Sequence, residues 1–122
     1  MNYKSCHFSR KMRLLIPKEY RRVFEKNNYF YFKCATVLVR VNDLMHPRLG
    51  VIVSKKNVKL STDRNKTKRI IREQFRLHQH ILPNVDIVFI MKKNAYSFIV
   101  SKQISEKLLR LWQKISLQLK EY

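Results

Sequence analysis

Glycine, proline and cysteine are all scarce in this sequence of 122 residues, which has one glycine, three prolines and two cysteines. A single glycine excludes a glycine-rich phosphate cradle, and no GxxxxGKS segment is present. Cys6 and Cys34 stand apart, without CxxC or Cys/His spacing. We therefore expect no disulfide framework and no protein-built metal site, and the thiols fit a structural role in a reducing compartment.

Acidic residues are also few, at eight Asp and Glu against 27 Lys and Arg. They are scattered along the chain, so neither the carboxylate cluster of a metal-dependent nuclease nor a histidine pair for general acid and base catalysis is visible. We expect no catalytic side chain, and if catalysis occurs near this protein, the catalyst lies elsewhere. A protein-only nuclease remains a weak alternative, which cleavage by the protein alone in Mg²⁺ would support.

Long apolar runs are missing as well. No run approaches the roughly 18 residues that a membrane span requires, and residues 1–16 lack the apolar core of a signal peptide. We expect a cytoplasmic protein without a membrane partner. An anionic membrane surface is a competing polyanion, but no segment combines an uninterrupted apolar face with Trp or Phe edges.

Positive charge is what the sequence has in excess, with a formal net charge of +19. The charge runs from Lys4 to Lys120, so it does not form a basic tail on a neutral domain. Such self-repulsion costs stability, and a large polyanionic partner relieves it by exchanging condensed counterions for Lys and Arg. The composition therefore predicts a nucleic-acid partner whose affinity depends steeply on salt.

The segment Arg64 to Arg76, RNKTKRIIREQFR, concentrates this charge at helical spacing. Projected at 100° per residue, one stripe about 60° wide holds four polar side chains: Asn65, Arg69, Arg72 and Arg76. Another side carries Thr67, Ile70, Ile71, Gln74 and Phe75. Guanidinium groups offer forked donors that suit phosphates. An ordinary solvated helix face is the alternative, but such faces mix charge signs, and Glu73 is the only acid in the segment.

Hydrophobic periodicity predicts a single α+β domain over residues 1–122, in the order α-β-β-α-β-α. Residues 1–16 read as a basic extended arm, and Pro17 starts a short helix. The further expected elements are a strand within 29–41, a turn over 42–47, a second strand over 48–54 antiparallel to the first, a basic loop over 55–60, a helix capped by Thr62 or Asp63 that ends near His80, a strand over 85–91 and a helix from about Ser101.

Aromatic residues gather beside the first helix and strand, at Tyr20, Phe24 and residues 29–32. Rings interleaved with basic residues can stack on unpaired bases. The alternative is that Tyr20 and Phe24 are core residues, and ring packing and an exposed edge can coexist. Lys55 and Lys56 would extend the basic surface from the helix toward the sheet edge, unless they are an ordinary surface pair. Trp112, flanked by Leu108 and Ile115 at helical spacing, is expected in the core.

Four segments in order resemble the protein subunit of bacterial ribonuclease P: the helix PKEYRRVFEK, then RLGVIVSKKNV, DRNKTKRIIREQFR and LPNVDIVFIMKK. The closing LLRLWQKI helix agrees, so the likeness covers nearly the whole chain. The basic helix carries what that family calls the RNR motif. Its members here are Arg64, Asn65, Lys66, Lys68, Arg69, Arg72, Glu73 and Arg76.

The resemblance implies an α/β sandwich with an uncommon left-handed β-α-β crossover, against the usual right-handed rule. It implies an accessory subunit of an RNA enzyme that removes the 5′ leader from precursor tRNA, with Mg²⁺ held mainly by the catalytic RNA and substrate phosphates. The partners are then the catalytic RNA and precursor tRNA, with no protein partner required. The implied RNA-binding residues are Lys55, Lys56, Arg64, Asn65, Lys66, Lys68, Arg69, Arg72 and Arg76, and Tyr20 and Phe24 are placed in the cleft for the leader.

Two features depart from that family's pattern. Many members have glycine after the basic pair that follows the last strand, where this chain has Asn94, a residue that tolerates left-handed backbone. The aromatic cluster over residues 29–32 also looks richer than the family norm, and the sequence leaves open which rings face the leader. Another small basic RNA-binding protein, of ribosomal type, explains the charge equally well but not the ordered motifs.

Overall fold

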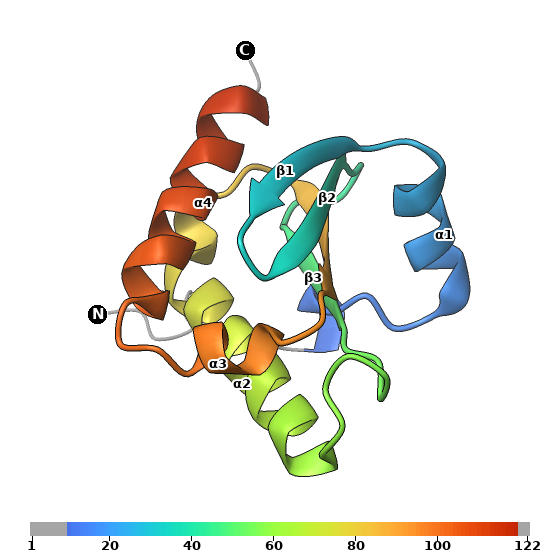
Figure 1. The fold of residues 1–122 in the computed structure, drawn as a ribbon. Helices are drawn as coiled ribbons and strands as arrows, with labels where there is room; N and C mark the ends of the chain where they lie inside the picture. Colours follow the sequence, from blue (N-terminus) through green and yellow to red (C-terminus); the bar gives the residue numbers. More distant parts are fainter. Residues whose placement is uncertain (1–9, 120–122) are drawn as a thin grey trace.

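A four-stranded mixed sheet forms the centre of the computed structural model, which describes residues 10–119 (Figure 1). The strands pair in the order β1-β2-β4-β3. Both β1–β2 and β2–β4 are antiparallel, whereas β3 and β4 are parallel. The strand bounds are β1 (Asn28–Phe32), β2 (Ala35–Val41), β3 (Arg48–Ile52) and β4 (Val85–Met91).

Helices cover both faces of this sheet, with α1 (Pro17–Glu25) on one side and the other three on the opposite side (Figure 1). Those three are α2 (Ser61–His78), α3 (Ala95–Ile99) and α4 (Ile104–Leu119), and the 3-10 turns η2 (Arg10–Met12) and η3 (Gln79–Ile81) complete the elements. The α+β class is confirmed. Helix α2 joins the adjacent parallel strands β3 and β4, and the left-handed sense of this crossover stays a prediction.

Strand alternation gives the sheet two apolar faces of unequal size. The larger core lies under α2 and α4 and contains Phe75, Phe89 and Trp112. Trp112 is fully buried, and its ring meets those of Phe75 and Phe89 edge to face at centroid distances of 6.1 and 5.7 Å. The smaller cluster under α1 has Val23 and Val88 at its centre. The expectation that Trp112 is a core residue is confirmed.

The expected single strand over residues 29–41 is wrong, because the segment folds back as a hairpin. Phe32 pairs with Ala35, which leaves Lys33 and Cys34 as a two-residue turn. Hairpin turns with positive φ select Gly or Asn, but Asn94 is the one described non-glycine residue with positive φ. This turn therefore needs no special residue, and the sequence carries no signal for it.

The second strand is also placed differently from the expectation. Strand β3 runs opposite to β2 as predicted, but it pairs with β4, which lies between them. With the hairpin and the short helix α3, the observed order contains one strand and one helix more than α-β-β-α-β-α. Asn94 precedes α3 with φ 64° and ψ 22°, so the tolerance of Asn for left-handed backbone is used.

Helix bounds differ by a few residues from those predicted. Helix α2 begins at Ser61 after Leu60, which makes no side-chain capping bond, so the predicted caps Thr62 and Asp63 are wrong. The helix ends at His78 and continues as η3, and α4 begins at Ile104, three residues after the predicted start. Tertiary burial of the apolar face fixes these ends more strongly than a cap does.

The segment before α1 is not a loose arm where the structure describes it. Met12 and Leu14 are buried, and Arg13 forms a parallel bridge with Leu49 of β3. The Leu14 amide donates to the Leu49 carbonyl at 3.0 Å. Residues 13 and 14 therefore meet the outer edge of β3 at Leu49, and Lys4 lies outside the described residues.

Candidate nucleic-acid interface

Helix α2 has the two faces that its spacing predicts. Thr67, Ile71 and Phe75 are buried against the sheet and α4. The opposite side, here called the basic face, lines a groove of about 510 Å³ together with Arg13 and Glu73. The basic face consists of Asn65, Lys68, Arg69, Arg72 and Arg76. Five of the seven predicted RNA-binding residues on this helix thus meet in one groove.

Arg64 and Lys66 are the two that do not. At 100° per residue, Arg64 projects between the buried Ile71 and Phe75. Its guanidinium Nη1 donates to the carbonyls of Val58 and Lys59 at 2.9 and 2.8 Å, so Arg64 holds the loop before α2. Lys66 is exposed outside the groove.

Lys55 and Lys56 lie in the turn that follows β3, and both are exposed. They do not line the basic groove. Two hydrogen bonds to Ser54, from the backbone amides of Asn57 and Val58, shape this turn. The lysines thus lie exposed in the turn between β3 and α2, and their role in extending the basic surface stays a prediction.

Arg76 is the most constrained member of the basic face. Its guanidinium pairs with Glu73 one turn earlier, and this hydrogen bond lowers the pKa of the Glu73 carboxyl. Both side chains remain partly exposed, at 31% and 51%. An exposed pair of this kind is worth little, so a phosphate can compete for the guanidinium.

Arg72 connects the basic face to helix α1. Burial lowers the pKa of its guanidinium and the nearby positive charge of Arg13 lowers it further, while Tyr20 acts in the opposite sense. Burial raises the pKa of the Tyr20 phenol, and Arg72 opposes that shift. These mutual effects indicate that the Tyr20 phenol of α1 and the Arg72 guanidinium of α2 lie near one another at the β3 edge.

The second predicted surface, here called the ring cleft, lies between α1 and β3. Its volume is about 350 Å³, and its lining is mostly apolar, consisting of Pro17, Tyr20, Arg21, Phe24 and Ile52. The Tyr20 and Phe24 ring centroids are 6.4 Å apart. Phe24 is 45% exposed, whereas Tyr20 is half-buried. Tyr20 is both a packing residue and a wall of the cleft.

Gly50 is what allows Tyr20 to occupy this position. A Cβ atom on Gly50 would lie 2.6 Å from the Tyr20 Cε1 and hydroxyl oxygen. The ring therefore lies directly on the backbone of β3. The sequence marks Gly50 only as the single glycine, and no local signal connects it with Tyr20.

The rings of residues 29–32 divide between the two faces of the sheet. Phe30 and Phe32 are buried in the larger core, whereas Tyr29 and Tyr31 are 56% and 63% exposed. Strand alternation puts the two tyrosines on the α1 side of the sheet. Strand register continues from Tyr31 through Thr36 and Ile90 to Ile52. This row leads from Tyr31 to Ile52, which lines the ring cleft.

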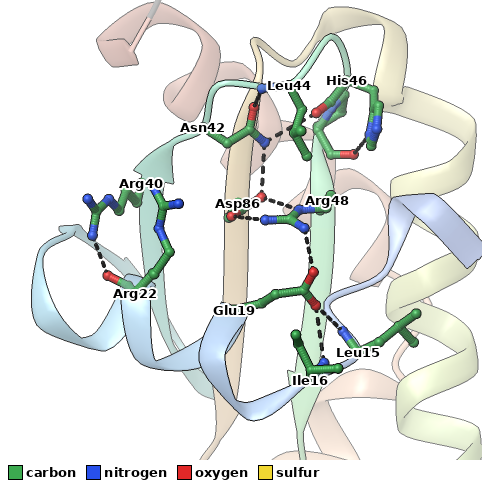
Figure 2. Close-up of polar contacts among 11 residues, drawn as sticks. Leu15, Ile16, Glu19, Arg22, Arg40, Asn42, Leu44, His46, Arg48 and Asp86 are labelled. Carbon is green, nitrogen blue, oxygen red and sulfur yellow. Dashed lines mark hydrogen bonds and ion pairs between the residues drawn. The ribbon is translucent and has the colours of Figure 1, made fainter.

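A polar cluster, not anticipated from the sequence, fixes α1 over the sheet (Figure 2). Arg48 binds Asp86 with two bonds of 2.8 and 2.7 Å and donates a third, of 2.7 Å, to Glu19. Asn42 donates to Asp86 at 2.9 Å. Glu19 accepts from the amides of Leu15 and Ile16 at 2.7 and 3.1 Å. A lone aspartate within the apolar VDIVFIM strand was the available signal.

The contacts within this cluster favour the charged forms of Glu19 and Arg48. Burial would raise the pKa of Glu19, but the two amide hydrogen bonds and the charge of Arg48 lower it below its ordinary value. The hydrogen bond to Asp86 raises the pKa of Arg48 despite desolvation. The cluster therefore holds the ring cleft in place through charged hydrogen bonds.

Other reactive chemistry is sparse in the described chain. Burial raises the pKa of the Cys34 thiol to about 11, so the thiol stays protonated at neutral pH. Within residues 10–119, no group of three or more His, Cys, Asp or Glu side chains could hold a metal ion. None of the helices described there has the length and apolarity to cross a membrane.

The matches to known proteins agree with this arrangement. The family model for ribonuclease P covers residues 8–116. This chain belongs to the ribonuclease P protein family. It is 46% identical over 109 residues to the ribonuclease P protein component of Photobacterium profundum, covering 89% of this chain and 92% of the relative. The corresponding protein of Aliivibrio fischeri is 46% identical over 117 residues, which cover 95% of this chain and 96% of the relative.

Solved structures of the ribonuclease P family have the same fold. The ribonuclease P protein from Thermotoga maritima superposes with a TM-score of 0.74 at 33% identity, covering 84% of this chain and 96% of that chain. The protein from Staphylococcus aureus superposes with a TM-score of 0.74 at 30% identity, covering 86% of this chain and 94% of that chain. The chain thus shares both the sequence pattern and the fold of the ribonuclease P protein family, a family of tRNA-processing proteins, and the resemblance to that family is confirmed.

Proposed function

We propose that this protein binds the catalytic RNA of ribonuclease P through α2 and the 5′ leader of precursor tRNA through the ring cleft. It thereby assists Mg²⁺-dependent endonucleolytic removal of the leader, which forms the mature 5′ end of the tRNA. The observation that carries this proposal is the separation of a groove lined by Arg and Lys from an apolar, ring-walled cleft. We place this activity in the cytoplasm, with no further protein partner.

The basic face supplies phosphate contacts. Lys68, Arg69 and Arg72 project along one side of a helix, so their spacing follows a ribose-phosphate backbone. Such contacts position an RNA without reading its sequence. Arg64 would contribute by holding the loop, and Lys55, Lys56 and Lys66 would extend the positive field around the helix.

The ring cleft supplies a different kind of contact. Phe24 offers an exposed ring, and Tyr20 a partly buried one. Aromatic faces stack on unpaired bases with little sequence preference, which suits a leader of varied sequence. A precursor with a leader would then bind more tightly than the mature product, which lacks one.

Mg²⁺ enters this proposal as a cofactor held mainly by the catalytic RNA and the substrate phosphates. The described side chains do not offer a metal-binding cluster, so no step is assigned to a protein-held ion. The protein instead lowers the like-charge repulsion between catalytic RNA and precursor. Its effect should therefore be largest where Mg²⁺ is scarce.

The decisive experiment measures precursor-tRNA cleavage at low Mg²⁺ by a bacterial ribonuclease P RNA, with and without this protein, beside the protein alone. Stimulation that requires both components supports the proposal. Cleavage by the protein alone would indicate a protein nuclease. An unchanged RNA cleavage rate and metal requirement would leave a generic RNA-binding protein of ribosomal type, which should sediment with ribosomes.

A further inference from the structure

A third groove reaches the edge of the sheet opposite to the one beside the two surfaces described above. It is formed by the β1–β2 turn, the residues after β4, α3 and α4 as far as Lys114, elements that lie beside one another in Figure 1. Its volume is about 940 Å³. We call it the hairpin groove. The basic face and the ring cleft flank β3, one edge strand, whereas the hairpin groove contains the turn that follows β1, the other edge strand.

The hairpin groove is strongly positive. The described residues that line it include five cations and no acid: Lys33, Lys93, Lys107, Arg110 and Lys114. Arg110 donates to Glu106 at 2.8 Å, but both side chains are about two-thirds exposed, at 66% and 64%. Because such an exposed ion pair is weak, Glu106 offsets little of the positive charge in the groove. A concave surface with these charges concentrates anions.

An aromatic ring orients one of these lysines, and a second ring orients a lysine just outside the groove. The Lys33 ammonium lies 5.5 Å from the centroid of the Phe98 ring in the groove wall, and the nearby Lys92 lies 5.6 Å from that of Tyr31. Cation–π contacts orient an ammonium without neutralising its charge. The groove therefore presents at least one positioned positive group, Lys33.

We propose that the hairpin groove binds the phosphate backbone of a second segment of the same structured RNA that the basic face of α2 binds. The inference rests on the proposed function, because it takes that RNA as the partner. The leader is expected at the ring cleft beside β3, so a partner at both edges of the sheet must be large enough to span the domain. A folded catalytic RNA meets this condition and matches the charge.

The test compares variants of the full chain for equilibrium affinity to a bacterial ribonuclease P RNA over a range of salt concentrations. The groove variant is Lys107→Ala/Lys114→Ala, at two exposed positions on one side of α4 where alanine keeps the helix. Its charge-matched control is Lys18→Ala/Lys26→Ala, two exposed lysines that line none of the three grooves. Arg69→Ala reports on the basic face.

The groove variant should bind several-fold more weakly than the control, with the slope of log K against log salt reduced by about two. Lys107→Arg/Lys114→Arg should restore both. A groove variant that behaves like the control while Arg69→Ala weakens binding would overturn the inference and leave the proposed function standing. Loss of affinity for precursor tRNA alone would also overturn it. Unweakened binding by Arg69→Ala would instead contradict the proposed function.

Discussion

Gly50 and Tyr20 illustrate how one residue shapes a binding surface from a distance in the sequence. The φ angle of Gly50 is not positive, so conformational freedom does not explain the glycine. Lack of space explains it, because a Cβ atom at position 50 would lie 2.6 Å from the Tyr20 ring. The ring would otherwise be displaced from β3 into the cleft.

Replacing Gly50 by Ala should therefore destabilise the protein by roughly 1–3 kcal/mol through overpacking. Chemical denaturation measures this change. In a Tyr20→Ala background the same substitution should lose its cost or become stabilising, because a strand glycine is intrinsically unfavourable by about 0.5–1 kcal/mol. An equal cost in both backgrounds would show that the Tyr20 ring is not what excludes a side chain at position 50.

At the scale of elements, the sequence predicts what local periodicity controls. The two faces of α2 and the limits of β4 follow from residue spacing, and both agree with the structure. The Lys33–Cys34 turn could not be found, because a turn with negative φ selects no particular residue. The role of Arg64 was also hidden, since its partners are carbonyls of a loop whose path is set by tertiary contacts.

The candidate site follows the same division. Spacing alone placed Asn65, Arg69, Arg72 and Arg76 together, whereas the meeting of Tyr20 with Arg72 depends on how α1 crosses β3. The Glu19–Arg48–Asp86 cluster that fixes this crossing joins three separate elements. Such long-range pairing has no periodic signature, so it becomes visible only in three dimensions.

That cluster gives α1 a pH-dependent anchor. The pKa of Glu19 is lowered in the folded protein, so its ionisation stabilises the fold above the unfolded value of about 4.3, and this contribution is lost as pH falls through the folded pKa. At pH 7 the free energy of unfolding of the wild-type protein should exceed that of the Glu19→Gln variant by about 1 kcal/mol. The difference should disappear toward pH 3.

Denaturant midpoints across this pH range measure the effect. Glu106→Gln is the matched control, because its carboxylate also pairs with an arginine, Arg110, but at an exposed position on α4, where an ion pair contributes little to stability. A constant difference between wild type and Glu19→Gln from pH 7 to pH 3 would show that Glu19 acts through shape and not through charge.

At the scale of the whole molecule, the net charge of +19 is distributed over surfaces with different chemistry. Arg72 of the basic face lies near Tyr20, a wall of the ring cleft, at the β3 edge. An RNA on α2 and a single strand in the cleft would thus be neighbours on the protein. Under the proposed function, this proximity would let the protein present a leader to the catalytic RNA, with charge contacts on one surface and stacking on the other.

The two surfaces should separate under substitution. Arg69 is the cleaner probe of the basic face, because it is exposed, whereas Arg72 is half-buried beside Tyr20. Arg69→Ala should weaken binding to the catalytic RNA and reduce the salt slope by about one, since one phosphate contact is lost.

Phe24→Ala should cost about 1–3 kcal/mol of precursor-tRNA affinity through lost stacking, with little change in salt slope. Binding isotherms for each RNA, with Lys18→Ala as the charge control, distinguish these effects. Identical losses for both substitutions on both RNAs would mean that the basic face and the ring cleft act as one surface.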